Sequence, residues 1–174
     1  MQAPEPTNHY GKTFAIIAWL IVMVLLYLFF QDTIDKQLNP NSQLNSVQGS
    51  RGETRTVLIR NKSGHYVGTA LLNNQPVDFM LDTGATTVAI AASTAEKLGL
   101  PVGRAMQVST ANGITSAYSS RIDRLQLGDI VLSNIPASIV PGLNNSGTEI
   151  LLGMSALKQL EFHQQGNQLT LIQH

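Results

Sequence analysis

The residues best suited to chemistry lie in the stretch FMLDTGATTVAI, residues 79–90. An apolar run stops at Asp82, Thr83 and Gly84, and a second apolar run begins directly after them. Burying a carboxylate without a partner costs free energy, so proteins keep such an acid mainly where it is used. The pattern therefore indicates that Asp82 is a catalytic acid at the end of a buried strand.

The chemistry that this acid could perform requires a second carboxylate. One carboxylate alone is a weak catalyst of amide cleavage, but two in contact cannot both ionise, so the pair shares one proton. One member can then act as a base on a water molecule while the other polarises the substrate carbonyl. The sequence contains one Asp-Thr-Gly motif. We therefore expect the second acid to come from another copy of the chain across a two-fold axis.

The elements that must position this motif are predicted to be mostly strands. Short apolar runs separated by turns fill the chain from Thr56 onward, and NKSG at 61–64 is predicted to join two of them as a hairpin. Asn112-Gly113 is the strongest hairpin signal. The stretch 91–101 is predicted to be a helix, and 150–160 a strand that leads into a second short helix. The pattern predicts a mainly β domain over residues 56–174.

An apolar segment precedes this domain. Residues 13–30 carry no charge and would form a helix of about 27 Å, close to the thickness of the hydrocarbon core of a bilayer. A helix in a soluble core would normally show a polar face, and a cleaved signal peptide a shorter apolar core followed by a small-x-small site. We therefore predict a transmembrane signal-anchor that holds the chain in the lipid bilayer, with residues 1–12 as a short cytoplasmic tail.

The segment 31–55 is rich in Asn, Gln, Ser and Gly, and it is predicted to be a flexible polar linker, with a surface loop of the domain as the alternative. Lysine and arginine are nearly balanced on the two sides of the span, so orientation is weakly encoded. The short N-terminal tail and the lack of a second span favour a cytoplasmic N-terminus. In a bacterium, the C-terminal domain would then be periplasmic.

Composition excludes several other classes of function. The 11 basic and 11 acidic side chains cancel, and a nucleic-acid-binding protein would show a clustered basic excess. The chain has no cysteine, which excludes disulfides, a cysteine nucleophile and thiolate metal sites. The four histidines lack metal-ligand spacing, and no phosphate-binding glycine loop or Gly-x-Ser-x-Gly motif occurs. We expect no metal, no cofactor and no nucleic-acid partner.

Three segments together resemble a known family. FMLDTGATTVAI resembles the active-site loop of the retropepsin-like aspartic proteases, and EILLGMSAL resembles their later apolar-apolar-Gly segment, here Leu151, Leu152 and Gly153. STANGITSAY lies between them, where the family places its flap hairpin. The resemblance covers about residues 56–172 and is greatest to the bacterial membrane-anchored branch. It implies a closed β-barrel or sandwich subunit at the bacterial inner membrane.

The resemblance also implies roles for individual residues. Asp82 would be the catalytic acid, one per subunit. Thr83 would hydrogen-bond across the dimer, and Gly84, followed by Ala85, would keep the backbone of the catalytic loop close to substrate. Asn112 and Gly113 would lie at the tip of the flap that closes over an extended peptide.

The chain departs from the viral members of this family at two places. The flap offers ANGI in place of a glycine-rich tip, and Met154 follows Gly153 where viral members carry an arginine that braces the dimer.

The expected function is a membrane-anchored, homodimeric aspartic endopeptidase acting on a polypeptide substrate. The alternative is a non-catalytic domain of the same fold that binds peptides or a protein partner at the membrane. Replacement of Asp82 by Asn would separate the two, because only proteolysis requires the acid.

Overall fold

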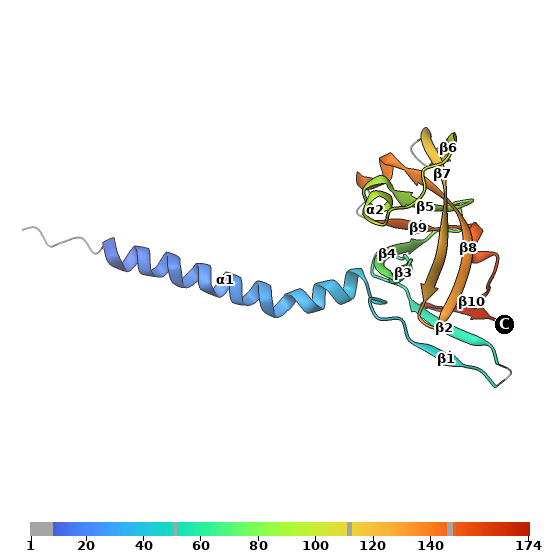
Figure 1. Ribbon diagram of the computed structural model, residues 1–174. Coiled ribbons are helices and arrows are strands. Elements are labelled where there is room, and N and C mark those ends of the chain that lie inside the picture. Colours follow the sequence, from blue (N-terminus) through green and yellow to red (C-terminus); the bar gives the residue numbers. More distant parts are fainter. Residues whose placement is uncertain (1–8, 51, 111–112, 146–147) are drawn as a thin grey trace, which may run out of the picture. The chain divides into compact units, whose positions relative to one another are not determined.

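The computed structural model describes residues 9–50, 52–110, 113–145 and 148–174. The chain divides into two compact units, Met1–Lys36 and Gln37–His174. Helix α1, His9–Leu38, accounts for the described part of the first unit and ends just inside the second. It is the blue helix of Figure 1.

Helix α1 exposes its apolar side chains on all sides, with Phe14 and Phe29 about three-quarters exposed. Its stretch Gly11–Leu38 is the one part of the described chain that is long and apolar enough to cross a membrane. Such a surface needs a cover other than water. Its length and composition are those of a membrane anchor or of a signal sequence.

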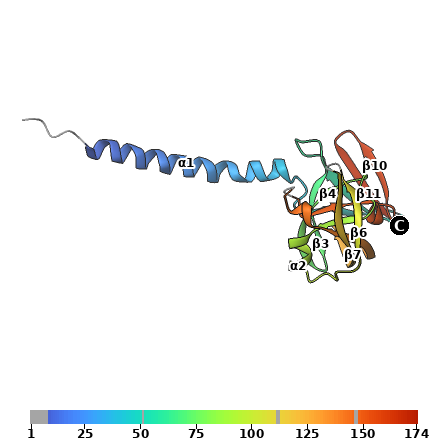
Figure 2. The same ribbon diagram turned by 90° about the horizontal axis from the view of Figure 1, so that it is seen from above.

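The second unit is mainly β, as predicted, and contains two sheets. The smaller sheet has the strand order β1-β2-β11-β10, and Figure 2 shows β10 beside β11. The larger has the order β3-β4-β9-β5-β8-β7-β6, and β3 also pairs with β7. This last pairing closes the sheet into a barrel, which leaves β6 as a strand attached outside the closed ring.

The strands of the smaller sheet are β1 (Ser46–Gln48), β2 (Thr54–Ile59), β10 (Glu161–Gln165) and β11 (Gln168–Gln173). Those of the larger sheet are β3 (Val67–Leu72), β4 (Gln75–Leu81), β5 (Val88–Ala91), β6 (Ala105–Thr110), β7 (Gly113–Leu127), β8 (Ile130–Val140) and β9 (Ile150–Leu152). Three short helices complete the unit: α2 (Ala92–Lys97), the 3-10 helix η1 (Pro141–Asn145) and α3 (Met154–Leu157).

The core is built by the alternation of side chains along the strands. In β3, every second residue is buried, and in β4 Val77 and Phe79 are buried between exposed neighbours. Phe79 is fully buried and belongs to the main core cluster. Asp82 therefore directly follows a strand whose side chains are packed in the core.

The turn at 61–64 forms, but the predicted hairpin around it does not. Asn61 Oδ1 accepts hydrogen bonds from the backbone N–H groups of Ser63 and His65, at 3.0 and 2.9 Å, as an Asn-centred turn should. The flanking strands then separate, because β2 pairs with β11 and β3 pairs with β4. The local turn was predicted correctly, but long-range pairing decided the partner of each strand.

The structure also differs from the predicted flexible linker at 31–55. Helix α1 continues to Leu38, and β1 pairs with β2. Asn41 is 3% exposed, and its side chain bonds the backbone N–H and C=O of Ile59 and the C=O of Val67. The linker was predicted from the average composition of the segment, which does not reveal that one asparagine forms hydrogen bonds with three backbone groups. The folded unit begins earlier than Thr56.

Candidate active site

Asp82 lies directly after β4, in the loop that leads to β5. Between these two strands runs β9, parallel to β4 and antiparallel to β5. The loop from Asp82 to Thr87 therefore crosses the end of β9, where Leu152 and Gly153 lie. Figure 1 shows β9 between β4 and β5. This topology brings together the two segments that the sequence singled out, although about seventy residues separate them.

Backbone hydrogen bonds bind the two segments to each other. The N–H of Asp82 donates to the C=O of Leu152 at 3.1 Å, and the N–H of Met154 donates to the C=O of Ala85 at 2.8 Å. Leu152 is fully buried. The loop is therefore bonded at Asp82 to the end of β9 and at Ala85 to the first residue of α3.

Gly153 occupies a position that admits no side chain. A Cβ there would lie 2.2 Å from the carbonyl oxygen of Thr87 and 2.7 Å from that of Ala85. Both atoms are backbone, so neither can turn away as a flexible side chain could. The glycine of the apolar-apolar-Gly segment is thus explained by close approach of two backbones.

The carboxylate of Asp82 is held by its own loop and is partly buried. Its Oδ1 accepts a hydrogen bond from the N–H of Gly84 at 2.8 Å. A Cβ on Gly84 would come within 3.1 Å of that oxygen, a tight contact that a shift of a few tenths of an ångström would relieve. Among the residues that the structure describes, none forms an ion pair with Asp82. The acid is oriented but keeps its remaining acceptor positions for other groups.

Thr83 is exposed, and its hydroxyl has no hydrogen-bond partner in the described part of the chain. A free hydroxyl beside the acid suits the role across a two-fold axis that the sequence predicted for it. That role stays a prediction, because the structure holds a single copy of the chain.

Two polar contacts that sequence reasoning missed support the loop. Ser155 is buried, accepts the N–H of Val88 at 2.9 Å and donates to the C=O of Pro136 at 2.7 Å. The hydroxyls of Thr87 and Ser138 lie 2.9 Å apart. No local pattern marks these residues, because their partners come from strands that are distant in sequence.

The predicted flap is a hairpin of β6 and β7, with Thr110 paired to Gly113. Gly113 has φ +106°, a conformation that favours glycine, and Asn112 lies outside the described residues. A small apolar cluster joins Val108 and Ala117 of the hairpin to strands β5 and β9. The hairpin therefore packs on β5, the strand that follows the loop of Asp82, and on β9, the strand that this loop crosses.

A cavity of about 420 Å³ opens beside the acid. Asp82 and Thr83 contribute to its wall, together with side chains from the turn after β2, from α3 and from the β10–β11 hairpin. The remaining lining residues are Arg60, Gly64, His65, Tyr66, Leu81, Leu157, Phe162, Gln164 and Leu169. The cavity wall thus combines an acid, Asp82, with a cation, Arg60, and several leucine side chains.

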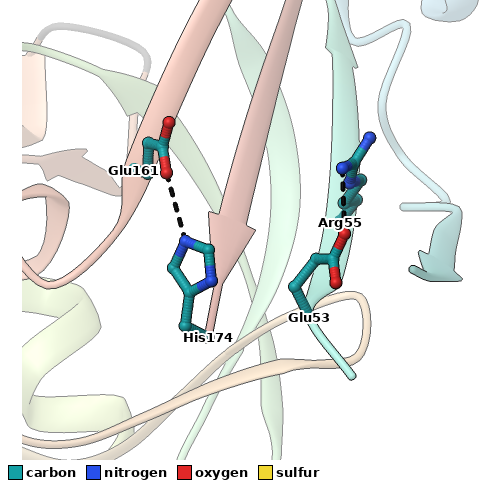
Figure 3. A network of polar contacts seen from close by, with 4 residues as sticks. All are labelled: Glu53, Arg55, Glu161 and His174. Atoms are coloured by element: carbon teal, nitrogen blue, oxygen red, sulfur yellow. Dashed lines mark hydrogen bonds and ion pairs between the residues drawn. The ribbon is translucent and has the colours of Figure 1, made fainter. Parts of the chain in front are cut away.

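Two ion pairs lie at the strand ends of the smaller sheet, among the residues that the structure describes (Figure 3). Arg55 pairs with Glu53 at 2.9 Å, and His174 pairs with Glu161 at 3.1 Å when the imidazole is protonated. The Glu161–His174 pair is largely exposed, so it contributes little to stability, whereas the Glu53 side chain is buried and its partner Arg55 is half-exposed. None of these four residues belongs to the cavity wall.

Comparison with known proteins identifies the family of this chain. Residues 68–159 match the model of the gag-polyprotein putative aspartyl protease family. The crystal structure of a retropepsin-like aspartic protease from Rickettsia conorii is 30% identical, with a TM-score of 0.56, and the match covers 67% of this chain and 98% of that one.

Two relatives are known from sequence. One is an uncharacterized protein in the cobV 5' region of a Sinorhizobium species, 31% identical over 121 residues, which are 68% of this chain and 51% of the relative. The other is the uncharacterized protein RP867 of Rickettsia prowazekii, 32% identical over 108 residues, 60% of this chain and 45% of the relative. The chain spans about half the length of these curated relatives. On the family model and the rickettsial structure together, this chain belongs to the retropepsin-like aspartic proteases.

Proposed function

We propose that this chain is a membrane-anchored aspartic endopeptidase whose active site forms between two copies, each giving one Asp82. The observation that carries the proposal is the state of that carboxylate. It is oriented by the Gly84 N–H, has no ion-pair partner in the described chain, and opens onto a cavity. A purely structural acid would be expected to accept from several side-chain donors, as Asp78 does on the preceding strand.

The reaction follows from two carboxyl groups that share one proton. The ionised carboxylate removes a proton from water, and the water oxygen attacks the carbonyl carbon of the peptide bond. The protonated carboxyl gives its proton to the carbonyl oxygen, which produces a neutral tetrahedral diol. The carboxyl that took its proton from water then gives that proton to the amide nitrogen as the C–N bond breaks, while the other carboxylate takes a proton from one hydroxyl of the diol, and one acid and one amine are released. At the end the pair again holds one proton.

The second copy supplies what one chain lacks. A lone Asp82 has no second carboxylate beside it with which it could share a proton. The exposed Thr83 hydroxyl beside it would bond the partner's loop and hold the two acids together. Anchoring by helix α1 in a bilayer would raise the effective concentration of each copy for the other.

We place the chain in a bacterial inner membrane with the domain on the periplasmic side. The support for the membrane is the apolar length of Gly11–Leu38, and Lys12 beside the start of the uncharged stretch agrees with a cytoplasmic N-terminal side. Reporter fusions at the C-terminus test this: a periplasmic phosphatase fused there should be active, and a reporter that works only in the cytoplasm should not. The reverse pattern would refute the orientation.

The activity is tested with the full chain in detergent micelles, on a mixed peptide library from acidic to neutral pH. Asp82→Asn keeps the shape of the side chain and should abolish cleavage. The matched control is Asp78→Asn, four residues earlier in the chain, whose carboxylate accepts from Thr69 and Asn39 at 2.6 and 3.2 Å. Cleavage should survive in this control if the domain stays folded. Equal cleavage by wild type and Asp82→Asn would refute the proposal and leave the peptide-binding domain as the alternative.

A further inference from the structure

Arg60 is the one permanently charged cation in the wall of the cavity beside Asp82. It follows β2, and its backbone N–H is bonded to the C=O of Asn167 at 2.8 Å, so the base of the side chain is fixed. The guanidinium carbon lies 5.4 Å from the centre of the Tyr66 ring, and Tyr66 is buried. Stacking on a buried ring fixes the plane of the guanidinium group.

The guanidinium is poorly satisfied within its own chain. Its Nε is buried and has no hydrogen-bond partner, and the contact from Nη2 to the Tyr66 hydroxyl is long, at 3.4 Å. No ion pair to Arg60 occurs among the residues that the structure describes. Arg55, by contrast, pairs with Glu53 at 2.9 Å. A buried donor without an acceptor is costly, and a guanidinium group presents several donors in one fork.

We propose that Arg60 and the cavity form a subsite for a carboxylate of the polypeptide substrate, either an Asp or Glu side chain or a free C-terminus. This inference rests on the proposed function. A carboxylate is planar and accepts two parallel N–H bonds from a guanidinium group, and here the two Nη groups would donate them, because the Nε is shielded from solvent. Arg60 would then be a specificity-determining residue next to the reacting acids.

The rest of the cavity wall suits an acidic side chain. Leu81, Leu157 and Leu169 give it an apolar floor against which methylene groups can pack. Asp82 is the one acid in the wall and would repel a second carboxylate. The cation of Arg60 offsets that repulsion and fixes where a substrate carboxylate can lie. A neutral amide of the same shape would leave the guanidinium without its counter-charge.

The test measures binding as well as cleavage, using the full chain in detergent micelles. The probes are pairs of fluorescent peptides that differ by one Glu→Gln change, scanned across each position, with free and amidated C-termini. Binding is measured by anisotropy on Asp82→Asn, which cannot consume the peptide. At one position, or at the free C-terminus, the carboxylate should bind about tenfold or more tightly than its amide. The free and amidated arms distinguish the two sources of carboxylate.

Arg60→Met in the Asp82→Asn background should remove this preference, and Arg60→Lys should keep part of it because a charge without the fork remains. The matched control is Arg124→Met. Arg124 also has a buried, unpartnered Nε, but it lies on β7, outside the cavity wall, and its Nη2 bonds Gln126. That control should keep the preference. The comparison of acid and amide peptides on Asp82→Asn alone needs no substitution at Arg60, so it holds even if Arg60→Met fails to fold.

Several results would overturn the subsite. These are equal binding of acid and amide at every position, a preference that persists in Arg60→Met, or a preference that Arg124→Met also removes. A shift of the monomer–dimer equilibrium in Arg60→Met with the preference intact would instead assign Arg60 to the contact between copies. If the wild-type chain cleaves nothing but the preference depends on Arg60, the proposed proteolysis fails and the carboxylate site stands.

Discussion

Gly153→Ala should displace the catalytic loop, because the added methyl group would meet backbone on two sides. Its Cβ would start 2.2 Å from the carbonyl oxygen of Thr87, and ordinary contact begins at 3.4 Å, so the backbones must separate by about 3.4 − 2.2 = 1.2 Å. That movement strains or breaks the bond from the Met154 N–H to the Ala85 C=O. Overpacking costs about 1–3 kcal/mol and one lost hydrogen bond about 1 kcal/mol, so we expect a loss of about 2–4 kcal/mol.

The assay is thermal unfolding of the full chain in detergent, followed by circular dichroism in the β region. A loss of this size should lower the Tm of the domain by about 10 °C. Gly142→Ala is the control, because a Cβ there meets nothing within 4 Å and its Tm should be unchanged. Cleavage should fall about a hundredfold in whatever Gly153→Ala protein remains folded, since the acid is displaced by about 1 Å. Equal Tm values for the two alanine variants would refute the close-approach argument.

Two further substitutions test how Asn41 anchors the folded unit and whether Thr83 contributes to the proposed contact between copies. Asn41→Ala removes the side-chain hydrogen bonds to the backbone groups of Ile59 and Val67, so urea unfolding should show a free energy of unfolding lower by about 2–4 kcal/mol. A decrease under about 0.5 kcal/mol, the size typical of surface substitutions, would contradict the anchoring role of Asn41. Thr83→Val replaces the hydroxyl with a methyl group and should shift sedimentation in micelles toward the monomer. Thr83→Ser keeps the hydroxyl and should not cause this shift. Unchanged sedimentation of the valine variant would remove Thr83 from the dimer contact.

The parts of this fold that could be predicted from the sequence are those where the backbone itself restricts the residue type. Gly153 must be glycine because two carbonyl oxygens leave no room, and Asn73 and Asn74 have positive φ at the tip of the β3–β4 hairpin, as asparagine in a two-residue hairpin turn commonly does. The alternation of buried and exposed residues in the middle of β4 can likewise be predicted from its sequence. Such constraints act within a few residues and can be recognised in one sequence.

The parts that could not be predicted depend on residues brought together by the whole fold. β2 was expected to pair with β3 and pairs with β11 instead, because both are apolar strands and only the completed core selects between partners. Ser155 bonds β5 and β8, and the guanidinium of Arg60 stacks on Tyr66 beside the acid. Serine and arginine have many roles on a protein surface, so their identity alone gave no sign of these contacts.

The smaller sheet joins strands from opposite ends of the folded unit, since β2 near its beginning pairs with β11, the last strand. A ribosome releases β2 and the loop of Asp82 long before β9 and β11 emerge. Pairing over such separations forms late and slowly. The acid therefore has no fixed position until β9 and β11 have emerged, so the cavity beside it forms only after the strands that complete it have been made.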